Sequence, residues 1–166
     1  MLYEIKIRLK SPVVGDTWDH KRHMFIFPRD ENAWALDIGT KHVWGGLIEN
    51  AIESLGLGVD SETIRWPSSL LLPKLHLLTV LPKDKRQRPC NHEAIPKNVV
   101  LTFTLMLRLT DGEQELAYPT PEQLYAIFKF IGEYEGISPF GSSKGYGLFT
   151  VQSIRPASFE SLCSMG

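Results

Sequence analysis

Residues 3–10 alternate strictly between apolar and charged side chains, and this pattern constrains the fold more than any other in the chain. Successive side chains of a β-strand point to opposite faces, so a period of two predicts a strand with one buried face. The buried positions are Tyr3, Ile5, Ile7 and Leu9. The rest of the chain must supply a core for this face.

A hairpin and a helix are predicted next. Two short apolar runs, residues 24–27 and 33–38, flank the turn-forming residues 28–32 and predict a β-hairpin. Residues 43–55 then carry apolar side chains at helical spacing, with Thr40 as N-cap and Gly56 as the glycine that ends the helix.

The second half predicts two long strands, a helix and a last strand. Apolar residues predict strands over 70–81 and 99–109, joined by a basic connection at 82–97. Thr120-Pro121-Glu122-Gln123 is a capping-box sequence that opens a helix, and residues 147–154 predict the final strand.

Without the early hairpin, this order is βαββαβ. We therefore expect an α+β, ferredoxin-like (RRM-like) fold with a β-hairpin insertion before the first helix. We expect a single domain over residues 1–155, with the insertion at about 17–38, a basic hairpin loop at about 82–98 and a tail at 156–166.

Composition limits the location and the partners. Hydrophobic residues make up 43% of the 166 residues, and the formal net charge is −1, so attraction to a nucleic acid must come from a local basic face. Cys90 and Cys163 are isolated in the sequence, and no signal peptide or bilayer-spanning segment is evident. We expect a soluble, cytoplasmic protein without membrane partners.

A glycine-rich stretch, residues 136–151, lies between the second helix and the last strand. Its glycines allow positive φ angles and close backbone approach, and the residues between them add hydroxyl groups and a cation. The loop residues of interest are Gly141, Ser142, Ser143, Lys144, Gly145, Tyr146 and Gly147. Such a loop suits a polyanion, although a plain flexible connection has the same composition. Tyr146 and Phe149, beside the glycines, are predicted to stack on bases.

Residues 18–23 combine an aromatic ring, a carboxylate, two histidines and two cations. Metal-independent RNA cleavage needs a base near the 2′-hydroxyl and a cation for the phosphorane, and His20 or His23 with Lys21 or Arg22 could supply them. A solvated loop is the alternative. His20 and His23 have no partner at metal-ligand spacing, so no metal or cofactor is expected.

The densest basic run lies in the 82–97 connection: Lys83, Lys85, Arg86, Arg88 and Lys97. A protruding basic hairpin can contact a phosphate backbone, and a solvated surface loop has the same pattern.

Three segments near the start of the chain, residues 11–16, 27–32 and 37–41, and the glycine-rich stretch resemble the RAMP superfamily of CRISPR-associated RNA-binding proteins. The resemblance covers about half of the chain. Thr40-Lys41 replaces the small residues usual before the first helix, and Lys144 stands where an arginine is frequent. We therefore expect a divergent or stand-alone member.

This resemblance implies antiviral defence and a set of RNA contacts. In the family, the glycine-rich loop and the start of the first helix lie beside the RNA, which implies contacts from residues 141–145, Lys41 and His42. Members that cut target RNA use an aspartate in the loop after the first strand, and Asp16 or Asp19 is the positional match in this chain. The implied partners are single-stranded RNA, CRISPR RNA or similar, and other effector-complex subunits. A stand-alone endoribonuclease and a protein-interaction module or viral mimic remain alternatives.

Overall fold

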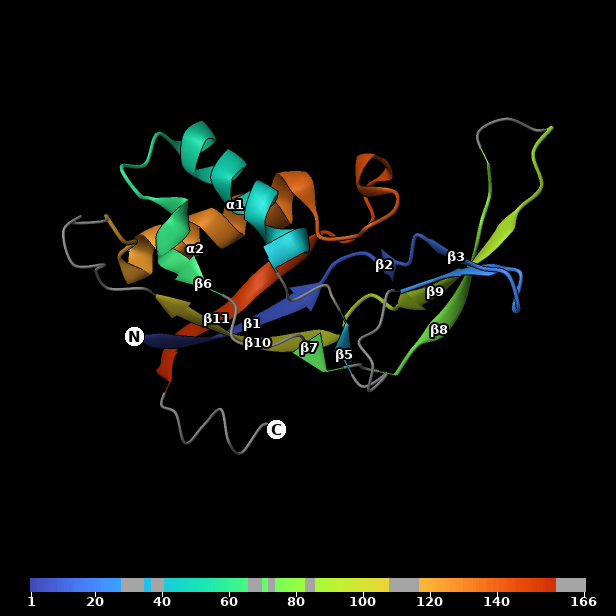
Figure 1. Ribbon diagram of the computed structural model, residues 1–166, viewed down its shortest axis with the longest axis horizontal. Coiled ribbons are helices and arrows are strands. Elements are labelled where there is room, and N and C mark those ends of the chain that lie inside the picture. The colour runs from blue at the N-terminus through green and yellow to red at the C-terminus, as the bar shows by residue number, and fades with distance from the viewer. Residues whose placement is uncertain are drawn as a thin grey trace.

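The computed structural model describes residues 1–27, 35–36, 41–65, 70–71, 74–82, 86–107 and 117–157, without the side chains of 35–36, 41–45, 65, 70–71 and 142. Within these residues the protein is α+β, as predicted, with helices packed on one face of an antiparallel sheet and a second sheet extending beyond it (Figure 1). No helix in the described part of the chain has the length and apolar content to cross a bilayer.

The main sheet has four strands in the order β11 (Phe149–Ala157), β1 (Leu2–Leu9), β10 (Val100–Leu107) and β6 (Ile64–Arg65). Each neighbouring pair is antiparallel. The alternation in the first strand is confirmed, because Tyr3, Ile5, Ile7 and Leu9 are all buried. A 3₁₀ turn, Ser61–Thr63, leads into β6, and β11 extends into the region expected to be a tail.

Two helices cover one face of this sheet, α1 (Lys41–Leu55) and α2 (Pro121–Phe130) (Figure 1). The capping box is confirmed: Oγ1 of Thr120 accepts from the Gln123 amide at 3.2 Å, and Oε1 of Gln123 accepts from the Thr120 amide at 2.9 Å. A π-helical turn, Ile131–Glu135, continues α2 and ends at Gly136. The ring of Phe128, on α2, packs against the ring of Phe103, on β10, with the two centroids 6.0 Å apart.

The second sheet extends from the main sheet toward one end of the molecule (Figure 1). Its order is β2 (Val13–Val14), β9 (Cys90–Ile95), β4 (Met24–Ile26) and β3 (Thr17–Asp19), and β8 (His76–Val80) also pairs with β9. A separate pair joins β5 (Ala35–Leu36) to β7 (Leu70–Leu71).

The predicted hairpin between residues 24–27 and 33–38 is wrong. β4 pairs with β3, across residues 20–23, and β5 pairs with β7. The turn between β3 and β4 is stabilised locally, because the Asp19 side chain and carbonyl accept hydrogen bonds from backbone amides of residues 21–23. The predicted turn at 28–32 lies outside the described residues.

The predictions for residues 70–97 also need correction. The apolar run 70–81 contains two separate strands, β7 and β8. The basic connection 82–97 contains β9, in which residues 92–95 are buried. The sequence did not predict β9 as a strand, because its buried positions include the polar residues His92 and Glu93.

Candidate nucleic-acid interface

The glycine-rich loop has the backbone conformation that its sequence predicts. Gly136, Gly141, Gly145 and Gly147 have φ angles of 77°, 76°, 88° and 78°, and Ser142–Lys144 forms a 3₁₀ turn. A side chain at Gly141 would overlap the ring of Tyr146, and one at Gly147 would overlap the backbone nitrogen of Ser138. Glycine is therefore required at both positions for steric as well as conformational reasons.

Hydrogen bonds attach this loop to the segment that follows β1. Ser11 Oγ donates to the carbonyl of Gly145 at 2.6 Å and accepts from the Leu148 amide at 3.0 Å. The Gly147 amide donates to the carbonyl of Pro12 at 2.8 Å. Ser138 Oγ accepts from the buried Val14 amide at 2.9 Å. Residues 11–14 and 138–148, which are far apart in the sequence, thus meet at this loop.

Part of the loop backbone is already engaged within the protein. The amides of Lys144 and Tyr146 both donate to the carbonyl of Gly141, at 2.8 and 3.2 Å. The groups directed to solvent include the exposed side chains of Ser143 and Lys144. Anion binding by this loop would therefore depend on side chains more than on a nest of free amides.

The turn between β3 and β4 is organised by Asp19. Its Oδ1 accepts from the amides of Lys21 and Arg22 at 2.9 and 3.4 Å, and its Oδ2 lies 3.6 Å from Nε of Arg22. The hydrogen bond from the Lys21 amide is the largest cause that holds the pKa of Asp19 below the ordinary value of 3.8. Asp19 is therefore an ionised structural group of the turn, which does not favour a role as general base.

A second contact joins this turn to β9. Arg22 Nη1 lies 3.9 Å from Oε2 of Glu93, and Oε1 of Glu93 accepts from the Phe27 amide at 3.1 Å. Glu93 is buried, so these contacts offset part of the cost of its burial. The cationic turn is in this way held against the sheet.

Three aromatic rings connect the turn to the glycine-rich loop. Phe25 of β4 and His92 of β9 are stacked, with centroids 4.6 Å apart, and His92 lies 4.7 Å from Phe140 of the loop. Lys144 Nζ lies 5.2 Å from the Phe140 ring centroid, within cation–π distance. His92 Nδ1 lies 2.7 Å from the carbonyl oxygen of Gly15, so Nδ1 carries the proton in this contact.

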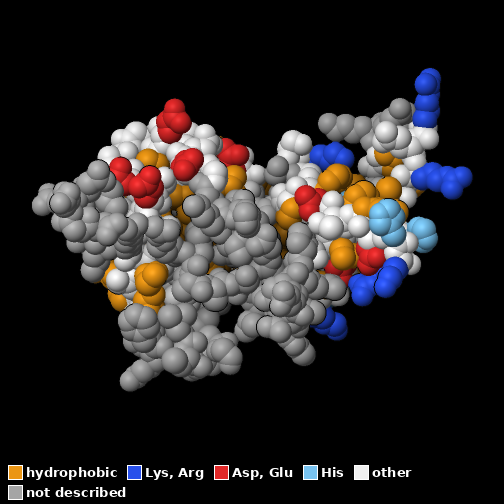
Figure 2. All heavy atoms as spheres, in the orientation of Figure 1, with side chains coloured by type: hydrophobic (Ala, Val, Ile, Leu, Met, Phe, Trp, Pro, Cys, Tyr) orange, Lys and Arg blue, Asp and Glu red, His pale blue; other side chains and the backbone are white. Residues whose placement is uncertain are grey.

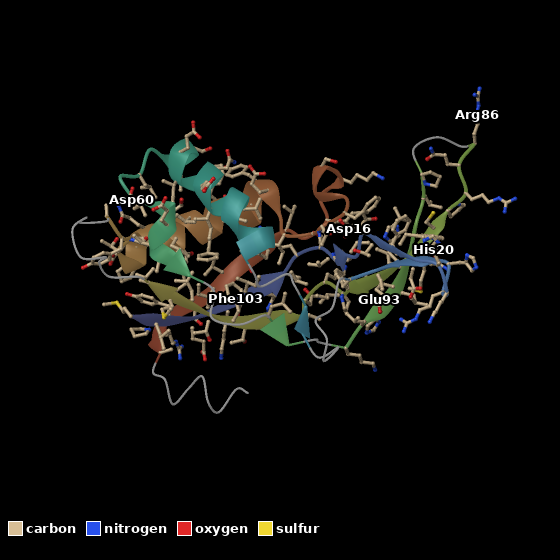
Figure 3. The ribbon with its side chains drawn as sticks, viewed as in Figure 1. Asp16, His20, Asp60, Arg86, Glu93 and Phe103 are labelled. Carbon is tan, nitrogen blue, oxygen red and sulfur yellow. The ribbon has the colours of Figure 1, made fainter. Side chains whose placement is uncertain are left out.

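Basic and aromatic side chains gather at this end of the molecule. Figure 2 shows Lys, Arg and His side chains over the second sheet, with some acidic side chains among them, and only acidic charged side chains over the helices. Exposed groups at the basic end are Trp18, His20, Lys21, Arg22, His23, Arg86, Arg88 and Lys144. Asp16, His20 and Glu93 lie here, whereas Asp60 lies at the opposite end (Figure 3).

The predicted residues are not all in one place. His20, His23, Ser143, Lys144 and the loop glycines belong to the turn and loop just described, and Asp16 is exposed, with Oδ1 3.3 Å from Thr17 Oγ1. Arg86 lies farther out, at the tip beyond β8 and β9, and Arg88 is exposed just before β9 (Figure 3). The side chains of Lys41, His42, Lys83, Lys85 and Ser142 lie outside those that are described. RNA contact shared by the start of α1 and the loop stays a prediction.

The prediction that Phe149 stacks on bases is wrong. Its side chain is 1% exposed, and a side chain at Gly132 would overlap its ring. Tyr146 is half-buried and lies over Gly141. The sequence reasoning missed Phe25, His92 and Phe140 as the link between two segments, because their distance in the chain leaves no local pattern. Only the position of Phe140 beside the glycines was a signal.

Among the described residues, no group of three or more His, Cys, Asp or Glu side chains could hold a metal ion. The arrangement offers cations, imidazoles and one exposed indole, which are the groups that contact phosphates and bases in nucleic-acid complexes. Comparison of the chain with models of protein families and with curated proteins found no match.

Proposed function

We propose that the protein binds RNA through the exposed residues of the β3–β4 turn and the glycine-rich loop. These residues form what we call the turn–loop surface: Trp18, His20, Lys21, Arg22, His23, Ser143 and Lys144. The observation that supports the proposal is the Phe25–His92–Phe140 contact, which joins the two segments that we predict to contact RNA.

Charge distribution supports a polyanion as the ligand. The chain as a whole has a net charge of −1, yet Lys21, Arg22 and Lys144 are exposed in the turn and the loop that the Phe25–His92–Phe140 contact joins. Exposed acids such as Glu49 and Glu53 belong to α1, whereas Asp19 and Glu93 lie within 4 Å of Arg22 and offset part of its charge. A local basic surface attracts a phosphate backbone even when the net charge does not.

The arrangement of the main sheet supports a RAMP-like, ferredoxin-like core as part of the same proposal. The antiparallel order β11-β1-β10-β6, with α1 and α2 on one face, is compatible with the strand order four-one-three-two of a βαββαβ unit. Such a protein would act as a CRISPR effector backbone or processing subunit, with single-stranded RNA and other effector subunits as partners.

RNA binding on the sheet face away from the helices has less support, because Leu2 and Thr104 on that face are buried. RRM domains stack bases on aromatic side chains of that face. Among the described residues of β1, β10 and β11, the side chains on the face away from the helices are not aromatic. They include Lys6, Arg8, Thr102, Thr104 and Thr150. The turn–loop surface is therefore the better candidate.

A second candidate function is metal-independent RNA cleavage by the β3–β4 turn. The observation that favours it is the placement of two exposed imidazoles, His20 and His23, beside one indole, with centroids 6.5 and 6.3 Å from that of Trp18. One imidazole could take the proton of the 2′-hydroxyl while the other protonates the leaving 5′-oxygen. Lys21 or Arg22 would stabilise the phosphorane.

Binding of labelled single-stranded RNA at a series of salt concentrations tests the first proposal. We expect affinity to fall steeply as salt rises, and Lys144→Glu to weaken binding at low salt by about tenfold or more. Lys129→Glu is the matched control, because it makes the same charge change at an exposed position of α2 and should have little effect. Absence of RNA binding at low salt would instead favour a protein-interaction module.

The cleavage proposal needs its own assay. RNA should be cut in the presence of EDTA, and the His20→Ala, His23→Ala double variant should lose cutting by a much larger factor than it loses RNA affinity. RNA that stays intact after long incubation with the wild-type protein would exclude this activity.

A further inference from the structure

We infer that Trp18 is the stacking site for one unpaired nucleobase of the bound RNA. This inference rests on the proposed RNA binding and adds a binding mode that contact with phosphates alone does not include. It assigns the ligand class as single-stranded RNA with an accessible base.

Trp18 is placed and held for such a role. It is 40% exposed, although a large apolar ring gains most from burial. Trp18 and Phe25 are cross-strand partners in the β3–β4 pair, and their ring centroids are 5.0 Å apart. The indole is therefore fixed by strand pairing on a short, well-bonded turn, which limits the entropy lost when a ligand stacks on it.

The described rings around the indole cross its plane and do not lie parallel to it. The rings of His20, His23 and Phe25 cross its plane at 88°, 64° and 67°. None of these three described rings is stacked parallel to it. A base has a flat π-face and stacks parallel on aromatic side chains, so it can take a position that these neighbours do not.

Chemical groups for the rest of a nucleotide lie close in the chain. Lys21 and Arg22 are exposed in the same turn and can contact the flanking phosphates. A base in a duplex is already stacked and paired, whereas a base in a single strand is free to bind the indole. Trp18 would therefore discriminate single-stranded from double-stranded RNA.

The test compares three ligands of equal length: single-stranded RNA, the corresponding duplex, and an abasic ribose-phosphate chain. We expect the wild-type protein to prefer the single strand. Trp18→Ala should weaken single-strand binding by about tenfold, within the range measured for base stacking. It should leave the affinity for the abasic chain and the salt dependence unchanged, and Trp18→Phe should retain most of the single-strand affinity.

Tyr134→Ala is the matched control, because it removes an aromatic ring that is 70% exposed on the π-helical turn. It should not change binding. Wild-type affinity of Trp18→Ala for the single strand would overturn the inference and leave the proposed function in place. Equal losses on the abasic chain would also overturn it, because they would mean that the turn is disrupted. No binding of any ligand by the wild-type protein would overturn both proposals.

Discussion

The imidazole of His92 stacks on the phenyl ring of Phe25, with 4.6 Å between the centroids and 15° between the planes. These residues are partners in the parallel pairing of β4 with β9, and Phe140 contacts the imidazole from the glycine-rich loop. A buried, hydrogen-bonded histidine thus connects three segments that are far apart in the chain.

His92→Ala should destabilise the protein by about 2–4 kcal/mol, because it removes a buried ring and leaves the carbonyl of Gly15 without its hydrogen bond. Urea unfolding followed by circular dichroism measures this change. His76→Ala, at an exposed position of β8, should change the free energy of unfolding by less than about 0.5 kcal/mol. Equal effects of the two substitutions would contradict the structural role of His92.

Two glycine substitutions in the same loop should differ strongly. Gly147→Ala places a methyl group against the backbone of Ser138 at a φ of 78°, so both overlap and backbone strain oppose it. Gly145→Ala has a similar φ of 88° but no atom within 4 Å of the added carbon, so it should cost only about 1–2 kcal/mol. Melting temperatures should therefore fall in the order wild type, Gly145→Ala, Gly147→Ala. A reversed order of the two variants would refute the loop geometry.

Ser138→Ala should cost about 1–3 kcal/mol, because it leaves the buried amide of Val14 without an acceptor. The serine hydroxyl also donates to the carbonyl of Phe140 at 2.6 Å, so the loop should lose protection from amide hydrogen exchange. Ser143→Ala, at an exposed position of the loop, is the control and should leave stability within about 0.5 kcal/mol. Unchanged stability of Ser138→Ala would show that this anchor is not needed.

The carboxyl group of Asp19 should titrate below pH 3.8 in the folded protein, chiefly because its ionised form accepts the hydrogen bond from the Lys21 amide. A pKa that is lower in the folded state gives stability that is present above the unfolded value. This stability is lost as the pH falls through the folded value. NMR titration of the side-chain carboxyl carbon measures the midpoint, and a midpoint at or above 3.8 would contradict the turn geometry. Asp19→Asn should reduce the loss of stability between pH 5 and acid pH.

Local signals in the sequence predicted the parts of the fold that depend on local physics. The alternation in residues 3–10 needs only the period of a strand, and the Thr120–Gln123 capping box closes within one helical turn. Strand β9 was missed because His92 and Glu93 are polar, and only partners elsewhere in the chain make their burial possible. Leu77 and Leu81 are apolar but exposed, so the sequence predicted a longer buried strand than β8.

The candidate site was predicted in pieces. Glycine positions indicated the loop, and the cluster of histidines and cations indicated the turn, because both are visible in short stretches of sequence. Their association depends on Phe25, His92 and Phe140, which come from three separate elements. Nothing in the sequence near any one of these residues specifies the other two.

The attachment of the glycine-rich loop to the segment after β1 has a consequence for biosynthesis. Ser11 and Val14 hydrogen-bond to Gly145, Leu148 and Ser138, which come at least 124 residues later in the chain. The same holds for β1, which is flanked on one side by β11. During translation, β10 can pair with one edge of the first strand, but its other edge must wait until residues 149–157 have left the ribosome. Until then the nascent polypeptide exposes one edge of a hydrophobic strand, and release or cleavage before that point would yield a fragment prone to aggregation.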